Sequence, residues 1–270
     1  MLGAETKLAK GVSTVKAGSS PVYVVTDKPL ASAKAGARTY PKAAKIVEKA
    51  VVIAKMDDAG ELELSPDPWL ASTSHSFLPY LQPAGEGEFT VRNVEDEEKG
   101  TCVELALGPA KEAPKNKFVD RYVTRYTTMR FKEPKPVEGK PNVIGVWVKG
   151  DSNWGQVRFE IEDAQGEVFK NLSTGSWWCC DIMDWPCNLC VNFDGWAYVY
   201  CPLRDTTLIS ERSPGPVVEQ WSSEGGNKVI DFPIKLRAVS VGVNRAKLDL
   251  VDFKPASNIL RFKDVCVSAD

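Results

Sequence analysis

The stretch Val157-Arg158-Phe159-Glu160-Ile161-Glu162 decides the class of fold, because apolar and polar residues alternate along it without a break. Side chains on a β-strand point alternately to opposite faces, so this stretch predicts a strand with one face toward a core. The other face carries Arg158, Glu160 and Glu162. Two interpretations of this polar row stay open: a solvated outer face, or the polar half of a binding groove.

Short stretches of the same kind lie on both sides of it, separated by turn residues at fairly regular intervals. Ala164-Gln165-Gly166 follows the alternating stretch directly, and Asp57-Asp58-Ala59-Gly60 separates two earlier stretches. The predicted strands cover residues 51–55, 61–64, 89–94, 101–107, 122–131, 143–149, 156–162, 167–169, 196–202, 236–243, 247–253 and 260–267. This spacing predicts an all-β chain folded as a two-sheet antiparallel β-sandwich.

Charge and hydropathy exclude several classes of partner. The 270 residues include 34 Lys and Arg against 36 Asp and Glu, so no overall field attracts nucleic acid. No run approaches the roughly 18 to 20 apolar residues of a membrane helix, and residues 1–11 lack the apolar stretch of a signal peptide. We therefore expect no nucleic-acid partner, no membrane span, and an export signal outside this sequence.

Residues 1–50 differ from the rest of the chain. Lys and Ala dominate there, and only residues 21–26 have strand character. Residues 40–54 suit a short helix or an extended linker, and we interpret them as a linker that runs into the first strand. We predict that residues 1–50 are the remnant of an upstream module plus a linker, and that residues 51–270 form the sandwich.

Three stretches, in order along the chain, carry a family resemblance. They are Val143-Ile144-Gly145-Val146-Trp147-Val148-Lys149-Gly150-Asp151, then residues 157–166, then Val191-Asn192-Phe193-Asp194-Gly195-Trp196-Ala197-Tyr198-Val199 leading into Pro202-Leu203. This order resembles the galactose-binding-like jelly-roll modules of carbohydrate-binding type in bacterial polysaccharide-degrading proteins. The resemblance covers roughly residues 51–270. It implies a jelly-roll sandwich and a non-catalytic module, joined to an upstream catalytic domain in a secreted or cell-surface protein.

Some residues of these stretches have an architectural role. Gly145, Gly166 and Gly195 suit turns or the close approach of strands, and we expect Trp147 at a core position.

The resemblance also implies a structural calcium ion near the first and last strands. Asp57, Asp58 and Asp264 are the candidate ligands, together with backbone carbonyls near Gly100. Members of the family commonly end in Ile-Asp-Asp, whereas this chain has Lys263 before Asp264. A lysine at a ligand position opposes calcium, which needs six to eight oxygen ligands. The alternative is that residues 57–60 are only a turn.

Four of the seven cysteines gather in one segment: Cys179, Cys180, Cys187 and Cys190. The alternatives are disulfides within this loop, packed reduced thiols, and a zinc site. Adjacent cysteines point poorly at one zinc ion, so we expect disulfides, which would tie down a long loop in an exported protein. Cys102 and Cys266, on the first and last long strands, are either bridged or a buried free pair.

Aromatic and polar residues concentrate in the same region, since six of the eight Trp lie between positions 147 and 196. Sugar-binding sites combine aromatic planes with polar groups that meet the hydroxyls. The candidate ligand-binding residues are Asp151, Asn153, Trp154, Trp177, Trp178, Trp185 and Trp221. For each Trp, packing within the sandwich or its loops is the alternative.

The sequence therefore predicts a non-catalytic module that binds a polysaccharide or oligosaccharide. The first alternative is a spacer domain that binds no glycan, and the second is a glycosidase or lyase. Carboxylate pairs such as Asp181 and Asp184, or Glu160 and Glu162, are available for acid–base chemistry, but no catalytic signature accompanies them. The single histidine, His75, leaves little room for a histidine-based site.

Overall fold

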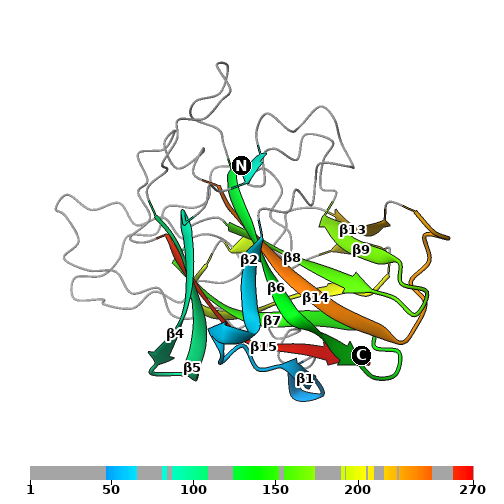
Figure 1. The fold of residues 1–270 in the computed structure, drawn as a ribbon. Helices are drawn as coiled ribbons and strands as arrows, with labels where there is room; N and C mark the ends of the chain where they lie inside the picture. Colours follow the sequence, from blue (N-terminus) through cyan, green and yellow to red (C-terminus); the bar gives the residue numbers. More distant parts are fainter. Residues whose placement is uncertain are drawn as a thin grey trace, which may run out of the picture. The chain divides into compact units, whose positions relative to one another are not determined.

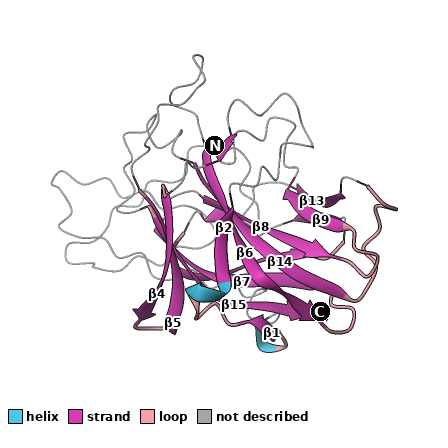
Figure 2. Ribbon diagram, in the orientation of Figure 1, coloured by secondary structure: helices cyan, strands magenta, loops and turns pink. Residues whose placement is uncertain are grey.

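The computed structural model describes residues 47–65, 81–83, 87–108, 124–151, 155–173, 190–191, 193–204, 206–209, 216–223, 225–244 and 258–269. Strands dominate these residues and form two sheets (Figures 1 and 2). A short 3-10 helix, η1 (Ala59–Glu61), precedes the second strand. No helix of the described part of the chain is long and apolar enough to span a membrane.

Sheet A combines strands from distant parts of the chain. Its order is β11 (Asp194–Pro202), β7 (Val143–Asp151), β15 (Ile259–Ser268), β5 (Gly100–Leu107) and β4 (Phe89–Asp96), and β1 (Val51–Ala54) also pairs with β15. Every pair in this sheet is antiparallel.

Sheet B is the larger of the two. Its order is β12 (Thr206–Ile209), β13 (Pro216–Ser223), β9 (Val168–Ser173), β8 (Gly155–Glu162), β14 (Ile234–Asn244), β6 (Thr124–Val137) and β2 (Leu62–Ser65). In addition, β10 (Cys190–Val191) pairs with β8, and β3 (Leu81–Pro83) pairs with β6 in the parallel direction.

The two sheets share one hydrophobic core. The inward residues of β8, Val157, Phe159 and Ile161, are buried in the same apolar cluster as Val146 and Val148 of β7. The chain passes from sheet B to sheet A and back through β6, β7 and β8, and again from β14 to β15. The predicted all-β, two-sheet antiparallel sandwich is therefore confirmed.

Trp147 lies on the outer face of sheet A, so the prediction of a core position is wrong. Its neighbours Val146 and Val148 are the fully buried residues of β7, and successive side chains on a strand point to opposite faces. The ammonium group of Lys99 lies 3.7 Å from the centroid of the Trp147 ring. The indole thus contacts a cation and also the ring of Tyr198 on β11, whose centroid lies 5.5 Å from its own.

The predicted roles of two glycines are confirmed. A Cβ atom at Gly145 would lie 2.6 Å from Cζ of Tyr198 and 2.7 Å from Cβ of Tyr200, so only glycine leaves room for the tyrosine on β11. Gly166 has a φ of 81° in the turn between β8 and β9, where residues with a Cβ are strained.

The predicted and observed strands differ mainly at sheet B. β6 extends to Val137, six residues beyond its predicted end, and β9 runs to Ser173. Strands β3, β10, β12 and β13 were not predicted. β3 and β10 have three and two residues and are defined by their pairing with β6 and β8, whereas β12 and β13 pair with each other. The strand predicted at 247–253 and residues 1–46 lie outside the described residues.

Candidate functional site

Most of the predicted ligand-binding residues fall in segments that the structure leaves undescribed. Asn153, Trp154, Trp177, Trp178 and Trp185 lie outside the described residues. Asp151 is the last residue of β7 and pairs with Asp194 of β11.

Trp221 is a core residue. It is 8% exposed, packs within the main hydrophobic cluster, and its Nε1 donates a hydrogen bond of 2.8 Å to the carbonyl of Pro202. Its ring therefore offers no exposed plane for a sugar, and the ligand-binding role predicted for it is not carried forward.

The Trp-rich segment joins two strands of sheet B. β9 ends at Ser173, and the chain is next described in β10, where Cys190 pairs with Gln156 of β8. Residues 174–189 thus connect at both ends to strands β9 and β10 of this sheet. Along the chain, the predicted aromatic residues Trp177, Trp178 and Trp185 are therefore joined to sheet B next to β8.

The outer face of sheet B carries a row of charged side chains that crosses four strands. Arg130 of β6 pairs with Ala238 of β14, Ala238 pairs with Glu160 of β8, and Glu160 pairs with Lys170 of β9. Because Ala238 is small, the Arg130 side chain passes over β14 and reaches the carboxylate on the strand beyond it.

The next row on this face is neutral apart from one arginine. Thr128, Ser240 and Arg158 are paired in register, and the hydroxyl groups of Thr128 and Ser240 share a hydrogen bond of 2.8 Å. Arg158 is 5% exposed and Glu160 is 3% exposed. The interpretation as a solvated outer face is therefore wrong for Arg158 and Glu160, because charged groups this deeply buried depend on protein partners instead of on water, whereas the side chain of Glu162 is 24% exposed.

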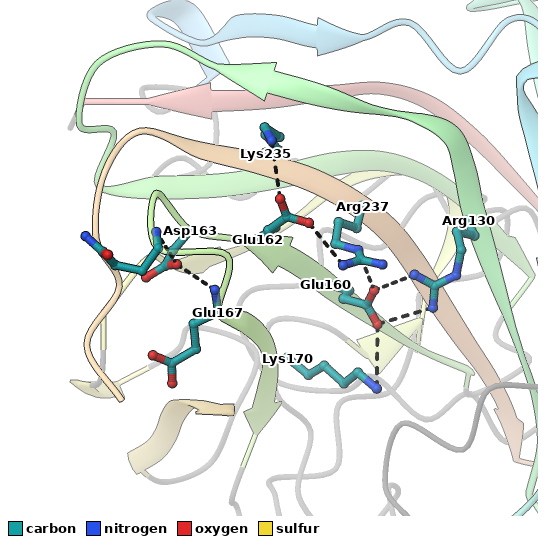
Figure 3. A network of polar contacts seen from close by, with 9 residues as sticks. Arg130, Glu160, Glu162, Asp163, Glu167, Lys170, Lys235 and Arg237 are labelled. Atoms are coloured by element: carbon teal, nitrogen blue, oxygen red, sulfur yellow. Dashed lines mark hydrogen bonds and ion pairs between the residues drawn. The ribbon is translucent and has the colours of Figure 1, made fainter. Parts of the chain in front are cut away.

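Glu160 lies at the centre of three converging cations (Figure 3). Its carboxylate accepts a hydrogen bond of 2.6 Å from Nη1 of Arg130, and Nη2 of the same arginine lies 3.5 Å away. Nε of Arg237 is 3.3 Å and Nζ of Lys170 is 3.6 Å from the carboxylate oxygens. A carboxylate with several donors of this kind is held in one position.

Arg237 reaches this position through a β-bulge. In the pairing of β14 with β8, Leu236 is opposite Ile161 and Ala238 is opposite Glu160, so Arg237 is the extra residue. A bulge of this type re-aims one side chain while the strand on either side keeps its alternation. The re-aimed guanidinium bridges Glu160 and Glu162, with its Nη1 3.0 Å from Oε2 of Glu162.

Glu162 and Lys235 complete what we call the Glu160 cluster, since Nζ of Lys235 lies 3.2 Å from Oε1 of Glu162. The cluster consists of two carboxylates and four cations: Glu160, Glu162, Arg130, Lys170, Lys235 and Arg237.

The turn that follows β8 is fixed by its own carboxylates. Asp163 accepts hydrogen bonds from the backbone N–H groups of Gln165 and Glu167, at 2.9 and 2.8 Å, and from that of Asp231 at 3.2 Å. Glu167 in turn accepts from the backbone N–H of Asn227 at 3.0 Å and from the Ser223 hydroxyl. These bonds connect the turn to the segment before β14 and so border the cluster with ordered backbone (Figure 3).

The outer face of sheet A carries a second charged row. Arg92, Glu104, Arg261, Lys149 and Trp196 are paired in register across five strands. Glu104 accepts hydrogen bonds of 2.6 Å from Arg92 and 3.0 Å from Arg261. Burial alone would raise the pKa of Glu104, but the hydrogen bonds from the two arginines outweigh it and lower the pKa.

Asp96, at the end of β4, is a second buried carboxylate beside this row. It accepts hydrogen bonds of 2.6 Å from Nζ of Lys149, 2.8 Å from Arg261 and 2.9 Å from the indole N–H of Trp196. Burial favours the neutral form, but these donors and the backbone N–H of Glu98 together hold the pKa of Asp96 far below its usual range.

The predicted calcium ligands include a helix cap. The carboxylate of Asp58 accepts a hydrogen bond of 2.8 Å from the backbone N–H of Gly60 and caps η1. This is the turn that the sequence offered as the alternative for residues 57–60.

A lysine ammonium group lies among the remaining oxygens. Nζ of Lys263 donates to the carbonyl of Thr101 at 2.7 Å and lies 3.8 Å from Oδ2 of Asp57. Asp264 follows with a φ of 45°, and burial raises the pKa of its carboxyl group. The described residues include no group of three or more His, Cys, Asp or Glu placed to hold a metal ion. These residues fit calcium poorly, because a fixed positive charge already takes the oxygen contacts.

Cys102 and Cys266 are buried free thiols, so the free pair and not the bridge is observed. Burial, reinforced by the Asp264 carboxylate, raises the pKa of the Cys266 thiol to about 12. Burial and the charge of Asp96 raise the pKa of Cys102. The predicted loop bridges fall on Cys179, Cys180 and Cys187, outside the described residues, and on Cys190 at the start of β10, and they stay a prediction.

No family model and no curated protein matches the chain. Among solved structures, it is similar to the family 11 carbohydrate-binding module of the cellulosomal cellulase Lic26A-Cel5E of Clostridium thermocellum, with 10% identity and a TM-score of 0.41 over 82% of this chain and 95% of that module. It is also similar to PfGH50B, with 10% identity and a TM-score of 0.35 over 67% of this chain and 22% of PfGH50B. At these identities the likeness concerns the fold alone, and the fold itself rests on the strand pairing given above.

Proposed function

We propose that the chain is a non-catalytic module that binds a polysaccharide or oligosaccharide on the outer face of sheet B. The observation that carries the proposal is the polar row Arg130, Glu160 and Lys170, in which a buried carboxylate is held by partly exposed cations across four strands of this face. Sugars present many hydroxyl groups at fixed angles, so their binding depends on polar groups held in fixed positions. Groups fixed before binding lose little entropy when a ligand docks.

The aromatic half of such a site would come from the segment that joins β9 to β10. Trp177, Trp178 and Trp185 belong to this segment, whose two ends continue β9 and β10 of sheet B. An indole ring stacks on the apolar face of a sugar, while polar groups of the sheet meet its hydroxyls. Asp151, Asn153 and Trp154, between β7 and β8, would approach the same end of β8.

The proposed module has no catalytic role. Glycosidases use one carboxyl group as an acid and a second as a base or nucleophile. Glu160 and Glu162 are engaged with two arginines and two lysines of neighbouring strands. Carboxylates that serve as fixed ion-pair partners support a binding surface better than proton transfer.

We also propose the setting that the family resemblance implies. The chain would act in a secreted or cell-surface bacterial protein, attached to a catalytic domain that degrades the bound glycan. In this setting the module adds affinity by multivalency, because the bound module raises the effective concentration of the enzyme at its substrate.

The test is a binding screen of the whole chain against neutral and acidic polysaccharides, followed by calorimetry on any that bind. Trp178→Ala is expected to weaken binding by about 30-fold or more, the effect of removing an aromatic anchor worth about 2 kcal/mol. Trp147→Ala on sheet A is the matched control and is expected to leave affinity unchanged. Binding to no glycan would favour the spacer alternative, and release of reducing ends would favour an enzyme.

A further inference from the structure

We propose that the glycan bound on sheet B is anionic, carrying carboxylate or sulfate groups that the Glu160 cluster recognises. This inference rests on the proposed function and names the ligand class for the same face. The cluster contains four cations and two carboxylates, a formal excess of two positive charges. Arg158 and Glu63, on the same face, offset one another in formal charge, and the neighbouring carboxylates of Asp163 and Glu167 accept hydrogen bonds from backbone N–H groups instead of from these cations.

The cations of the cluster are positioned by the buried carboxylate and remain partly accessible. Glu160 is almost fully buried, whereas the side chains of Lys170, Arg237 and Lys235 are 24%, 31% and 55% exposed. An anion that docks here meets ammonium and guanidinium groups that are already ordered. Arginine suits this task because its five N–H donors exceed what two carboxylate contacts use.

The backbone supports a specific role for this charge. The bulge in β14 exists at one position, and the residue it inserts is the arginine that contacts both carboxylates. Ala238, the next residue, leaves room for Arg130 to approach Glu160 across β14. An ordinary surface ion pair needs neither a bulge nor a small central residue, and it contributes little to stability.

Two pairs of ligands that differ in charge separate the inference from the proposed function. The first pair is polygalacturonate and its methyl ester, and the second is dextran sulfate and dextran. We expect at least one anionic member to bind more than tenfold tighter than its neutral partner, and its affinity to fall as salt rises from 50 to 500 mM. The two pairs also distinguish carboxylate from sulfate as the recognised group.

Variants on the two sheets provide the matched control. Lys170→Gln removes a peripheral cation of the cluster and is expected to weaken binding of the preferred anionic glycan about tenfold. Arg92→Gln removes the same charge from sheet A, where the arginine pairs with Glu104, and is expected to leave affinity unchanged. Thermal unfolding of each variant verifies that the sandwich is intact.

The outcomes are distinct. Equal binding of charged and neutral partners, with no effect of Lys170→Gln, would overturn the anionic ligand while leaving glycan binding in place. Binding to neither pair nor to any glycan of the wider screen would overturn both proposals. Binding of single-stranded DNA as tightly as the anionic glycan would also overturn the inference, because the cluster would then act as an unspecific polyanion site.

Discussion

The outer faces of the two sheets both bury a carboxylate among cations, but they arrange the charges in different ways. On sheet A, two buried carboxylates share three cations from neighbouring strands, and Arg261 bridges Asp96 and Glu104. On sheet B, cations from three strands converge on Glu160, and a further lysine is added through Glu162.

The two faces differ in how the number of cations compares with the number of carboxylates. Sheet A has three cations for its two carboxylates, and Asp96 also receives an indole N–H and a backbone N–H. Its donors and acceptors are satisfied within the sheet. The Glu160 cluster has four cations for two carboxylates, and the neighbouring carboxylates of Asp163 and Glu167 accept from backbone N–H groups instead of from these cations. Under the proposal, the shared carboxylates of sheet A brace the fold, whereas the partly exposed cations around Glu160 meet the ligand.

The largest expected effect is a difference in unfolding free energy between variants at Asp96 and at Glu160. Asp96→Ala removes the partner of Lys149, Arg261 and a buried indole, and breaking a buried pair in this way costs about 3–5 kcal/mol of unfolding free energy. Glu160→Ala leaves cations that are partly hydrated already, so we expect a loss of about 1–3 kcal/mol. Urea unfolding followed by tryptophan fluorescence measures both. A larger loss at Glu160 would contradict the assignment of sheet A as the brace.

The dependence of stability on pH is expected to come largely from sheet A. Asp96 and Glu104 have folded pKa values below their usual range, so they bind protons more weakly in the folded than in the unfolded state. Their contribution is fully present above the unfolded pKa of about 4 and is lost as pH falls toward the folded values. We expect the unfolding free energy to decrease from pH 5 to pH 2, and Asp96→Asn to show a smaller decrease. An unchanged slope in this variant would locate the effect elsewhere.

The aromatic part of sheet A allows a test that changes no charge. Gly145→Ala places a Cβ 2.6 Å from the Tyr198 ring, so the tyrosine has to move. Overpacking of this kind typically costs about 1–3 kcal/mol. The melting temperature should fall, while affinity for a glycan bound on sheet B should stay the same. Lost binding with an intact fold would mean that the ligand uses sheet A.

A smaller effect is expected at the end of the same sheet, where Lys263 joins β15 to Thr101 and Asp57. Lys263→Met removes these contacts and should cost about 1–2 kcal/mol, toward the low end of the range for hydrogen bonds that involve a charged group. Calcium chloride or a chelator should shift the melting temperature of the original protein by less than a degree. A rise of several degrees with calcium would show that Asp57, Asp58 and Asp264 do bind the ion.

The last test measures the reactivity of the thiols and involves the smallest energetic effect. A raised pKa and burial keep Cys266 and Cys102 as unreactive thiols, so iodoacetamide at pH 8 should label them only after unfolding. The cysteines at 179, 180, 187 and 190 should stay unlabelled without reductant even after unfolding, because we predict that they form disulfides. Mass spectrometry after proteolysis reads both results. Labelling of all four would refute the loop bridges.

The sequence predicted those features of the fold that depend on a local pattern of residues. Alternation in residues 157–162 identified a strand with a core face, and the two glycines marked a close approach and a turn. The same pattern assigned Glu160 to the outer face without indicating its partners.

The partners of Glu160 follow from strand order and not from any motif. Arg130 lies 30 positions before Glu160 and Arg237 lies 77 positions after it. No sequence pattern near either arginine predicts the contact. The bulge that re-aims Arg237 exists only in relation to the neighbouring strands β8 and β6. The surface role predicted for Trp221 was wrong. Its polar neighbours in the sequence suggested an exposed position, whereas its strand places it in the core.

The bulge at Arg237 also affects how the site can change between related proteins. Deleting this one residue would restore regular pairing between β14 and β8, with Leu236 and Ala238 still on their present faces. The same event would remove the guanidinium that bridges Glu160 and Glu162. The charge of this surface is therefore encoded in the length of the chain as well as in its residue types, and the proposal predicts that a homologue with a one-residue gap at this position prefers a different ligand.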